Sequence, residues 1–149
     1  SLGRRVGRAV REPTPVRSFD ELVIVMKRAS GLRFDEELPL WHFYGTDIVL
    51  SAINIGKGAY AIDAPVIHND GFKGRLGPDF TEGYDFLRRK WRDQLPVRTS
   101  ILWVSATRLP LCLYQLRAWR SVDRRRKVAM DNSAEPTHFA GLSGLEQLE

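Results

Sequence analysis

Two short stretches of the sequence contain residue types that could do chemistry. The first, residues 41–47 (WHFYGTD), ends with Asp47 in the first turn of an expected helix. Backbone N–H groups and the helix dipole stabilise a carboxylate there, and a carboxylate ionised at neutral pH can accept a proton from a reacting hydroxyl. Gly45 would let the backbone pass close to a ligand. Asp47 is therefore a candidate general base, or a residue that only stabilises the start of the helix.

The second stretch, residues 63–70 (DAPVIHND), ends an extended segment just before a glycine-rich loop. His68 there could help to bind a divalent cation, although such a cation also needs oxygen ligands. A histidine at the end of a strand is more often a surface residue that makes a hydrogen bond. The residues alone leave both roles open for His68.

Residues 31–36 (GLRFDE) precede these two stretches, and the three pieces resemble the second half of GT-A glycosyltransferases of family 2 type. In that family an apolar strand, here residues 22–26, ends in a basic residue and leads into a Gly-Leu-x-Phe-Asp-Glu loop. An acidic motif then opens a helix, and a further strand leads to a histidine. The order and spacing match from about Asp20 to Asp70, roughly a third of the chain.

The resemblance implies a role for each matched residue. Asp47 falls on the catalytic base, and His68 falls on the histidine that helps to hold Mg²⁺ or Mn²⁺ beside the departing nucleotide diphosphate. Trp41, His42 and Tyr44 fall on the acceptor side, where an aromatic face packs against a sugar ring. The implied reaction moves a sugar from a nucleotide-sugar donor to a hydroxyl of a glycan or glycolipid acceptor, with inversion, as in polysaccharide biosynthesis.

The sequence departs from that family in two ways. Thr46 stands where the family usually has Glu, which leaves the base in place. No Asp-x-Asp motif, the family's nucleotide-binding signature, occurs in the chain, so the nucleotide-binding residues stay unknown. We therefore expect the acceptor-side half of a transferase, with weak or no activity alone. The alternative is a non-catalytic α/β module that docks on a membrane surface or a partner chain through a basic segment.

The elements that must position these residues alternate between strand and helix. We expect a strand at 22–26, a helix at 46–55 that ends at Gly56, and a strand at 59–62. This order indicates an α/β fold. With the resemblance, the fold class becomes the C-terminal part of a Rossmann-like GT-A domain with added C-terminal helices.

The second half of the chain reads as mostly helical. Asp79 is the expected N-cap of a helix that ends before Pro96, and its apolar positions repeat at helical spacing. A short strand or buried turn at 101–104 and a helix at 111–119 follow. We assign residues 1–130 to a partial glycosyltransferase domain and 131–149 to a polar tail, for which disorder is one interpretation.

Composition limits the classes of partner that the chain could bind but does not select one of them. The chain has 149 residues, a net charge of +5 and one cysteine, Cys112, which favours a cytoplasmic location. The longest apolar stretch, 101–116, contains Arg108 and Pro110 and is too short to span a bilayer. The basic run at 124–127 suits an anionic membrane surface, and hence peripheral attachment, better than nucleic acid, since no nucleic-acid-binding motif accompanies it. Pairing through an exposed sheet edge would give a homodimer.

Overall fold

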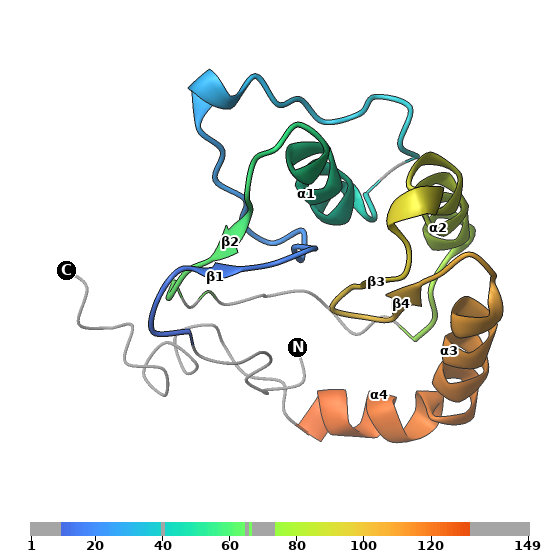
Figure 1. Cartoon of the computed structure of the whole chain (residues 1–149). Helices are drawn as coiled ribbons and strands as arrows, with labels where there is room; N and C mark the ends of the chain where they lie inside the picture. The colour runs from blue at the N-terminus through green and yellow to red at the C-terminus, as the bar shows by residue number, and fades with distance from the viewer. Residues whose placement is uncertain (1–9, 40, 65, 67–73, 132–149) are drawn as a thin grey trace.

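The computed structural model describes residues 10–39, 41–64, 66 and 74–131. This part of the chain is mixed α and β, with four α-helices and two small antiparallel sheets (Figure 1). Strand β1 (Thr14–Pro15) pairs with β2 (Tyr60–Ala61), and β3 (Val97–Arg98) pairs with β4 (Trp103–Val104). The helices are α1 (Tyr44–Asn54), α2 (Pro78–Lys90), α3 (Leu109–Arg120) and α4 (Val122–Asp131). Short 3-10 turns occupy Arg28–Ser30 and Arg92–Gln94.

Helix α1 confirms the expected helix and begins two residues earlier, at Tyr44. Phe43 precedes it in the left-handed conformation, with φ at 71°. Gly56, with φ at 72°, follows the last turn, and its N–H donates to the carbonyl of Ile53 at 3.0 Å. The glycine expected to end the helix therefore does so, because a positive φ is cheap only without a Cβ.

Helix α2 confirms the second expected helix, although its predicted cap was wrong. The helix begins at Pro78, where the missing N–H of proline costs nothing, and Gly77 is the residue before it. Asp79 therefore lies in the first turn and is not the N-cap. Its carboxylate is still favoured there by the helix dipole.

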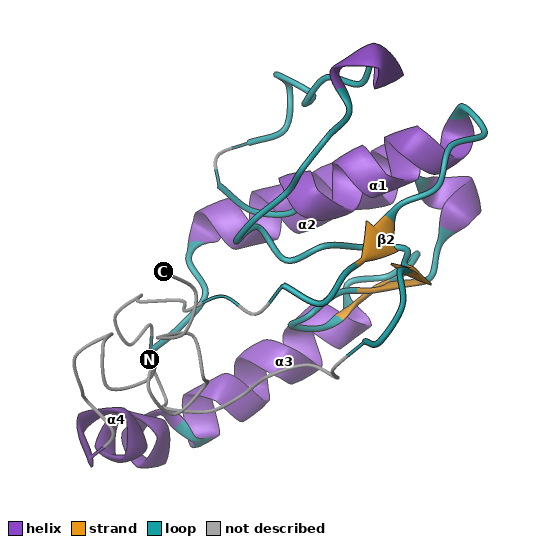
Figure 2. Ribbon diagram, turned by 90° about the vertical axis from the view of Figure 1, so that its left-hand side faces the viewer, coloured by secondary structure: helices purple, strands orange, loops and turns teal. Residues whose placement is uncertain are grey.

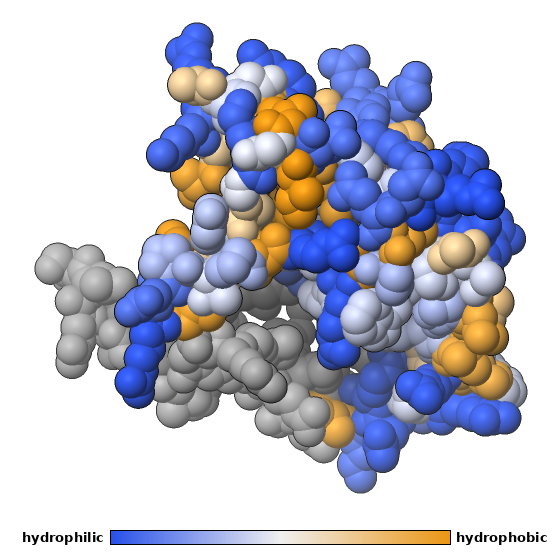
Figure 3. All heavy atoms as spheres, viewed as in Figure 1, coloured by the Kyte–Doolittle hydropathy of each residue, from blue (hydrophilic) through white to orange (hydrophobic). Residues whose placement is uncertain are grey.

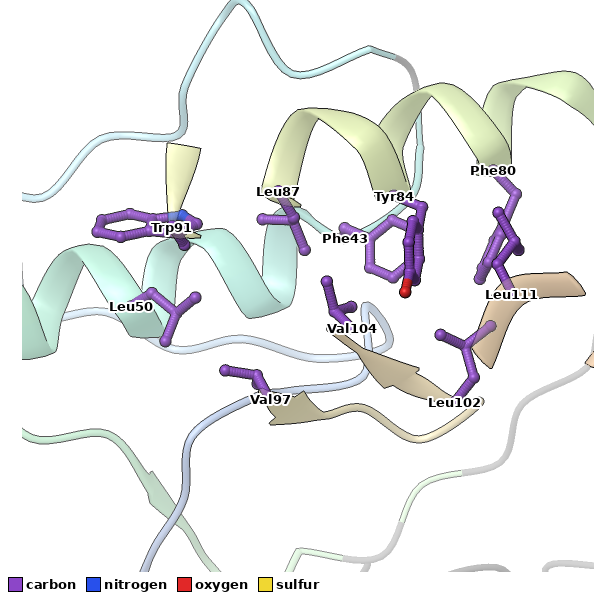
Figure 4. Packing of buried hydrophobic residues seen from close by; sticks show 10 residues of the cluster. All are labelled: Phe43, Leu50, Phe80, Tyr84, Leu87, Trp91, Val97, Leu102, Val104 and Leu111. Atoms are coloured by element: carbon purple, nitrogen blue, oxygen red, sulfur yellow. The ribbon is translucent and has the colours of Figure 1, made fainter. Parts of the chain in front are cut away.

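The core lies between α1, α2, α3 and the β3–β4 hairpin (Figure 4). Helix α2 contributes residues at helical spacing, which points one apolar face inward as expected. Tyr84 is fully buried, and its hydroxyl donates to the carbonyl of Thr107 at 2.9 Å. The buried cluster consists of Phe43, Leu50, Phe80, Tyr84, Leu87, Trp91, Val97, Leu102, Val104 and Leu111.

A buried carboxylate also connects α2 to the start of α3. Asp85 accepts hydrogen bonds from Nη1 of Arg88 at 3.0 Å and from Nε of Arg108 at 2.9 Å, and it contacts Nη2 of Arg108. The hydrogen bonds from Arg108 hold the pKa of the Asp85 carboxyl below its usual range, against the opposing effect of burial. Arg88 and Arg108 thus both pair with Asp85, while the buried Nε of Arg88 has no hydrogen-bond partner among the described residues.

The prediction of a strand at residues 22–26 was wrong. These residues form no regular structure, and Val23 and Val25 are 62% and 86% exposed. An apolar run becomes a buried strand only where neighbouring strands pair with its backbone, and none does so here among the described residues. Both sheets there are two-stranded and antiparallel, so the structure is mixed α/β without showing a Rossmann-like sheet.

The C-terminal elements differ in length from the expected ones. The strand at 101–104 is reduced to Trp103–Val104, the helix at 111–119 becomes α3, and the basic run lies within α4. In the part of the chain that the structure describes, no helix is long and apolar enough to cross a membrane. The tail from 132 to 149 lies outside the described residues.

Candidate functional site

Asp47 is buried at the start of α1 and is held by the end of α2. Only 1% of the residue is exposed. The indole Nε1 of Trp91 donates to its Oδ1 at 2.6 Å. The ammonium of Lys90 lies 2.8 Å from Oδ1 and 2.9 Å from Oδ2. We call these three residues the Asp47 clamp.

Lys90 connects the clamp to the loop before α1. Its Nζ donates to Oδ2 of Asp35 at 2.6 Å, so one ammonium serves two carboxylates. Burial lowers the pKa of Lys90, but the hydrogen bonds to Asp35 and Asp47 outweigh burial and raise it. The pKa of Asp35 is lowered, first by its hydrogen bond from Lys90. Lys90 is therefore a stable cation at neutral pH, and its side chain is still 27% exposed.

The clamp leaves Asp47 some capacity to accept another hydrogen bond. Each carboxylate oxygen can accept two, and Oδ2 receives one from Lys90. Oδ2 is thus the atom at which Asp47 could take a proton from a bound hydroxyl. Since Asp47 itself is buried, a hydroxyl would reach Oδ2 only after neighbouring side chains rearrange.

The three residues expected on the acceptor side have different surroundings. Trp41 is 77% exposed, which leaves its indole face open to a ligand. His42 packs its ring edge against Phe80, with centroids 5.1 Å apart, and its Nε2 lies 3.3 Å from Oδ2 of Asp79. The structure therefore attaches His42 to the first turn of α2, and its role toward an acceptor stays a prediction.

Tyr44 faces the segment before the first helix. Its hydroxyl donates to the backbone carbonyl of Glu21 at 2.7 Å, and its ring meets Phe34 edge-on, with centroids 5.5 Å apart. The hydroxyl of Tyr44 and part of its ring are therefore already in contact with other residues of the chain. A role for Tyr44 in binding a sugar also stays a prediction.

The expected metal ligand, His68, lies outside the described residues, and so does Asp70. Within the described ranges, no three histidine, cysteine or acidic side chains gather in a group that could hold a metal ion. The Mg²⁺ or Mn²⁺ site therefore stays a prediction that depends on residues 67–73.

Gly45 is explained by the chain itself and not by a ligand. A Cβ at this position would lie 2.7 Å from the backbone carbonyl oxygen of Phe19, closer than such atoms approach in proteins. The glycine lets the backbone at Phe19 pass close to the first turn of α1. The sequence analysis expected a ligand close to Gly45, and the close neighbour that the structure shows is the backbone of Phe19.

Glu21 is a candidate that the sequence analysis missed. Burial, and then repulsion from the neighbouring Asp20, raise the pKa of its carboxyl to about 7, while nearby backbone N–H groups of Gly45 and Phe43 lower it in part. A carboxyl that titrates near neutral pH suits acid–base chemistry. The sequence signal that could have found it is the pair of adjacent acids before an apolar run.

Comparison of the chain with protein-family models, with curated proteins and with solved structures found no match. The resemblance described above therefore depends on the quoted motifs of this sequence alone.

Proposed function

We propose that this chain provides the acceptor side of a nucleotide-sugar-dependent glycosyltransferase, with Asp47 as the general base. The observation that carries the proposal is the clamp itself. The resemblance assigns Asp47 a chemical role, and the structure surrounds that residue with a buried ion pair and an indole hydrogen bond. A buried ion pair contributes little net stability compared with apolar packing, so stability alone is a weak reason to place one there.

In the proposed reaction, an acceptor hydroxyl lies beside Oδ2 of Asp47. Its oxygen bonds to the anomeric carbon of the donor sugar as the bond from that carbon to the nucleotide diphosphate breaks. The hydroxyl proton passes to Oδ2, and the bonding pair leaves with the diphosphate. One displacement inverts the anomeric configuration. A divalent cation, bound with the help of His68, would supply charge stabilisation for the diphosphate.

In this proposal, the neighbours of Asp47 determine which of its two carboxylate oxygens reacts. The indole of Trp91 fixes Oδ1, which leaves Oδ2 as the reactive oxygen. Lys90 occupies Oδ2 before the acceptor arrives, and its second partner, Asp35, holds the ammonium close by once it moves. Trp41 offers an exposed aromatic face for the acceptor sugar.

The finer fold assignment is part of the same proposal. In it, α1 and β2 are elements of the C-terminal part of a GT-A domain, with α3 and α4 as additions. Assembly of a cell-surface polysaccharide or glycolipid, at the cytoplasmic face of a membrane, is the process that fits the resemblance. Fold analogy alone does not define the donor or the acceptor.

One observation favours the alternative, a non-catalytic α/β binding module. Asp47 is 1% exposed and each of its oxygens accepts a hydrogen bond, as expected of a carboxylate that only joins two helices. In this alternative Asp47 has no relation to His68, and the basic helix α4 makes the functional contact.

Isothermal titration of the chain with UDP and GDP, with and without Mn²⁺, distinguishes the two. The proposed function predicts weak binding of one nucleotide that requires Mn²⁺, is lost in His68→Ala and is kept in Asp47→Asn, which retains an oxygen for Trp91. Absence of Mn²⁺-dependent binding, or binding that His68→Ala leaves intact, contradicts the proposed site and favours the module.

A further inference from the structure

Helix α3 is apolar on two opposite faces. Leu111 and Ala118, seven residues apart, are buried against the core. On the other side of the helix, Leu109, Leu113 and Leu116 are 62%, 45% and 42% exposed. We call these three residues the leucine stripe. Their spacing of four and then three residues places them in one row along the helix. Figure 3 shows hydrophobic side chains at the right-hand edge of the molecule, over α3.

Basic residues lie at the C-terminal end of the stripe. From Leu109 to Val128 the sequence contains six basic residues and one acidic residue, Asp123. Arg124, Arg126 and Lys127 of α4 are exposed. In the described part of the chain, no carboxylate forms an ion pair with any of these three side chains. The helix that bears the apolar row is thus followed directly by a strongly cationic helix.

An open pocket of about 720 Å³ joins the two features where α3 meets α4. Trp119, which is 56% exposed, and Arg120 line it from α3, and Arg126 lines it from α4. Arg75 lines it from the loop before α2, and Gly74, Val122 and Asp123 complete the lining. The pocket therefore presents three guanidinium groups and an indole beside a single carboxylate, that of Asp123, and this net positive lining suits a phosphate at a membrane interface.

We propose that the leucine stripe and the basic residues of α4 dock the protein on an anionic phospholipid bilayer. The leucines enter the boundary between headgroups and acyl chains, Trp119 lies at headgroup depth, and the pocket at the α3–α4 joint receives a lipid phosphate. This inference is independent of the proposed function, since it uses none of the clamp residues.

Charge complementarity selects this occupant over two others. A second copy of the chain would bring the same cationic helix against the first, and like charges at a contact are unfavourable. A nucleic acid would pair with the arginines but would leave the leucine stripe in water. An anionic bilayer satisfies both the charge and the apolar row.

Sedimentation with lipid vesicles tests the proposal. Vesicles of phosphatidylcholine with about 30% phosphatidylglycerol, a composition chosen for a strong negative surface potential, should bind the chain. Pure phosphatidylcholine vesicles should bind it far more weakly, and raising the salt concentration should release it from the anionic ones. The double variant Leu113→Gln/Leu116→Gln should bind about tenfold more weakly, since two side chains lose their apolar burial.

Matched variants distinguish the effect of the positive charges of α4 from the effect of the shape of its arginine side chains. Arg124→Gln/Arg126→Gln should weaken binding roughly thirtyfold, while Arg124→Lys/Arg126→Lys should keep most of it. Val25→Gln, at an exposed valine of another segment, should bind like the unmodified chain, and circular dichroism should show that all variants fold. The proposal is overturned if anionic vesicles do not bind the chain, if the leucine variant binds as well as the parent, or if ultracentrifugation shows a dimer that this variant dissolves.

Discussion

At the scale of single residues, the Asp47 clamp makes the strongest stability prediction. Asp47→Ala would leave the buried indole N–H of Trp91 without an acceptor and remove one of the two partners of Lys90. Breaking a buried pair from one side costs about 3–5 kcal/mol. Asp47→Asn keeps an oxygen for the indole, so we expect a smaller loss of about 1–3 kcal/mol.

Urea unfolding of the two variants beside the parent chain measures this difference. A midpoint for Asp47→Ala equal to that of the parent would show that the clamp contributes nothing to folding. Asp85→Asn offers a comparison, because it loosens the other buried carboxylate and leaves Asp47 untouched.

The raised pKa of Glu21 predicts how the stability of the folded chain depends on pH. Its pKa of about 7 in the folded chain exceeds the ordinary 4.5, so the folded state holds this proton more tightly than the unfolded state. Its stabilising contribution is therefore fully present below about pH 4.5 and is lost as the pH rises through 7. Because the carboxyl is only partly shielded from water, we expect Glu21→Gln to stabilise the chain by about 1 kcal/mol at pH 8, less than the full shift implies.

Unfolding curves at pH 5 and pH 8 check this expectation. The gain from Glu21→Gln should be present at pH 8 and should nearly vanish at pH 5. A gain of the same size at both pH values would mean that the carboxyl of Glu21 does not titrate differently in the folded chain.

At the scale of elements, the first turn of α1 lies in close contact with the backbone of Phe19, and only a glycine at position 45 leaves room for this contact. Gly45→Ala would place a Cβ 2.7 Å from the carbonyl oxygen of Phe19, and this oxygen belongs to the backbone and cannot turn away like a side chain. Overpacking of this kind costs about 1–3 kcal/mol. We therefore expect Gly45→Ala to destabilise the chain, although the same change inside an open helix stabilises it by about 1 kcal/mol.

Ser51→Ala, in the same helix, is the matched control. It adds helix propensity without a close contact and should leave the urea midpoint unchanged or slightly raised. If Gly45→Ala also raises the midpoint, the segment over α1 is free to move away and does not hold the first turn.

Across the whole molecule, local patterns predicted the helices better than the partners of their side chains. Helices α1 and α2 follow from apolar residues at helical spacing and, for α1, from Gly56 at its end, whereas the start of α2 was expected at Asp79 and lies at Pro78. The strand expected at 22–26 is absent because, among the residues that the structure describes, no neighbouring strand pairs with this apolar run. The sequence placed Asp47 at a helix start correctly.

The hydrogen-bond partners of Asp47 could not be predicted from the spacing of residues in the sequence. Lys90 and Trp91 lie 43 and 44 residues further along the chain, and only the packing of α2 on α1 brings them to the carboxylate (Figure 2). Their residue types suggested other roles, a cation near a helix C-terminus and an apolar core residue. Glu21 was missed for the same reason, since its raised pKa results from burial that no local pattern reports.

The central claim is that Asp47 shares a site with the metal and nucleotide expected at His68. The most direct test is an ¹H–¹⁵N spectrum of the four tryptophan indole groups during titration with Mn²⁺–UDP and Mn²⁺–GDP, with Mg²⁺ as the diamagnetic reference. Since Trp91 donates to Asp47, its signal reports on the clamp. We predict that Mn²⁺ with one nucleotide broadens Trp91 far more than Trp119, and that His68→Ala abolishes this broadening. Equal broadening of both signals, or broadening that persists in His68→Ala, would contradict the claim.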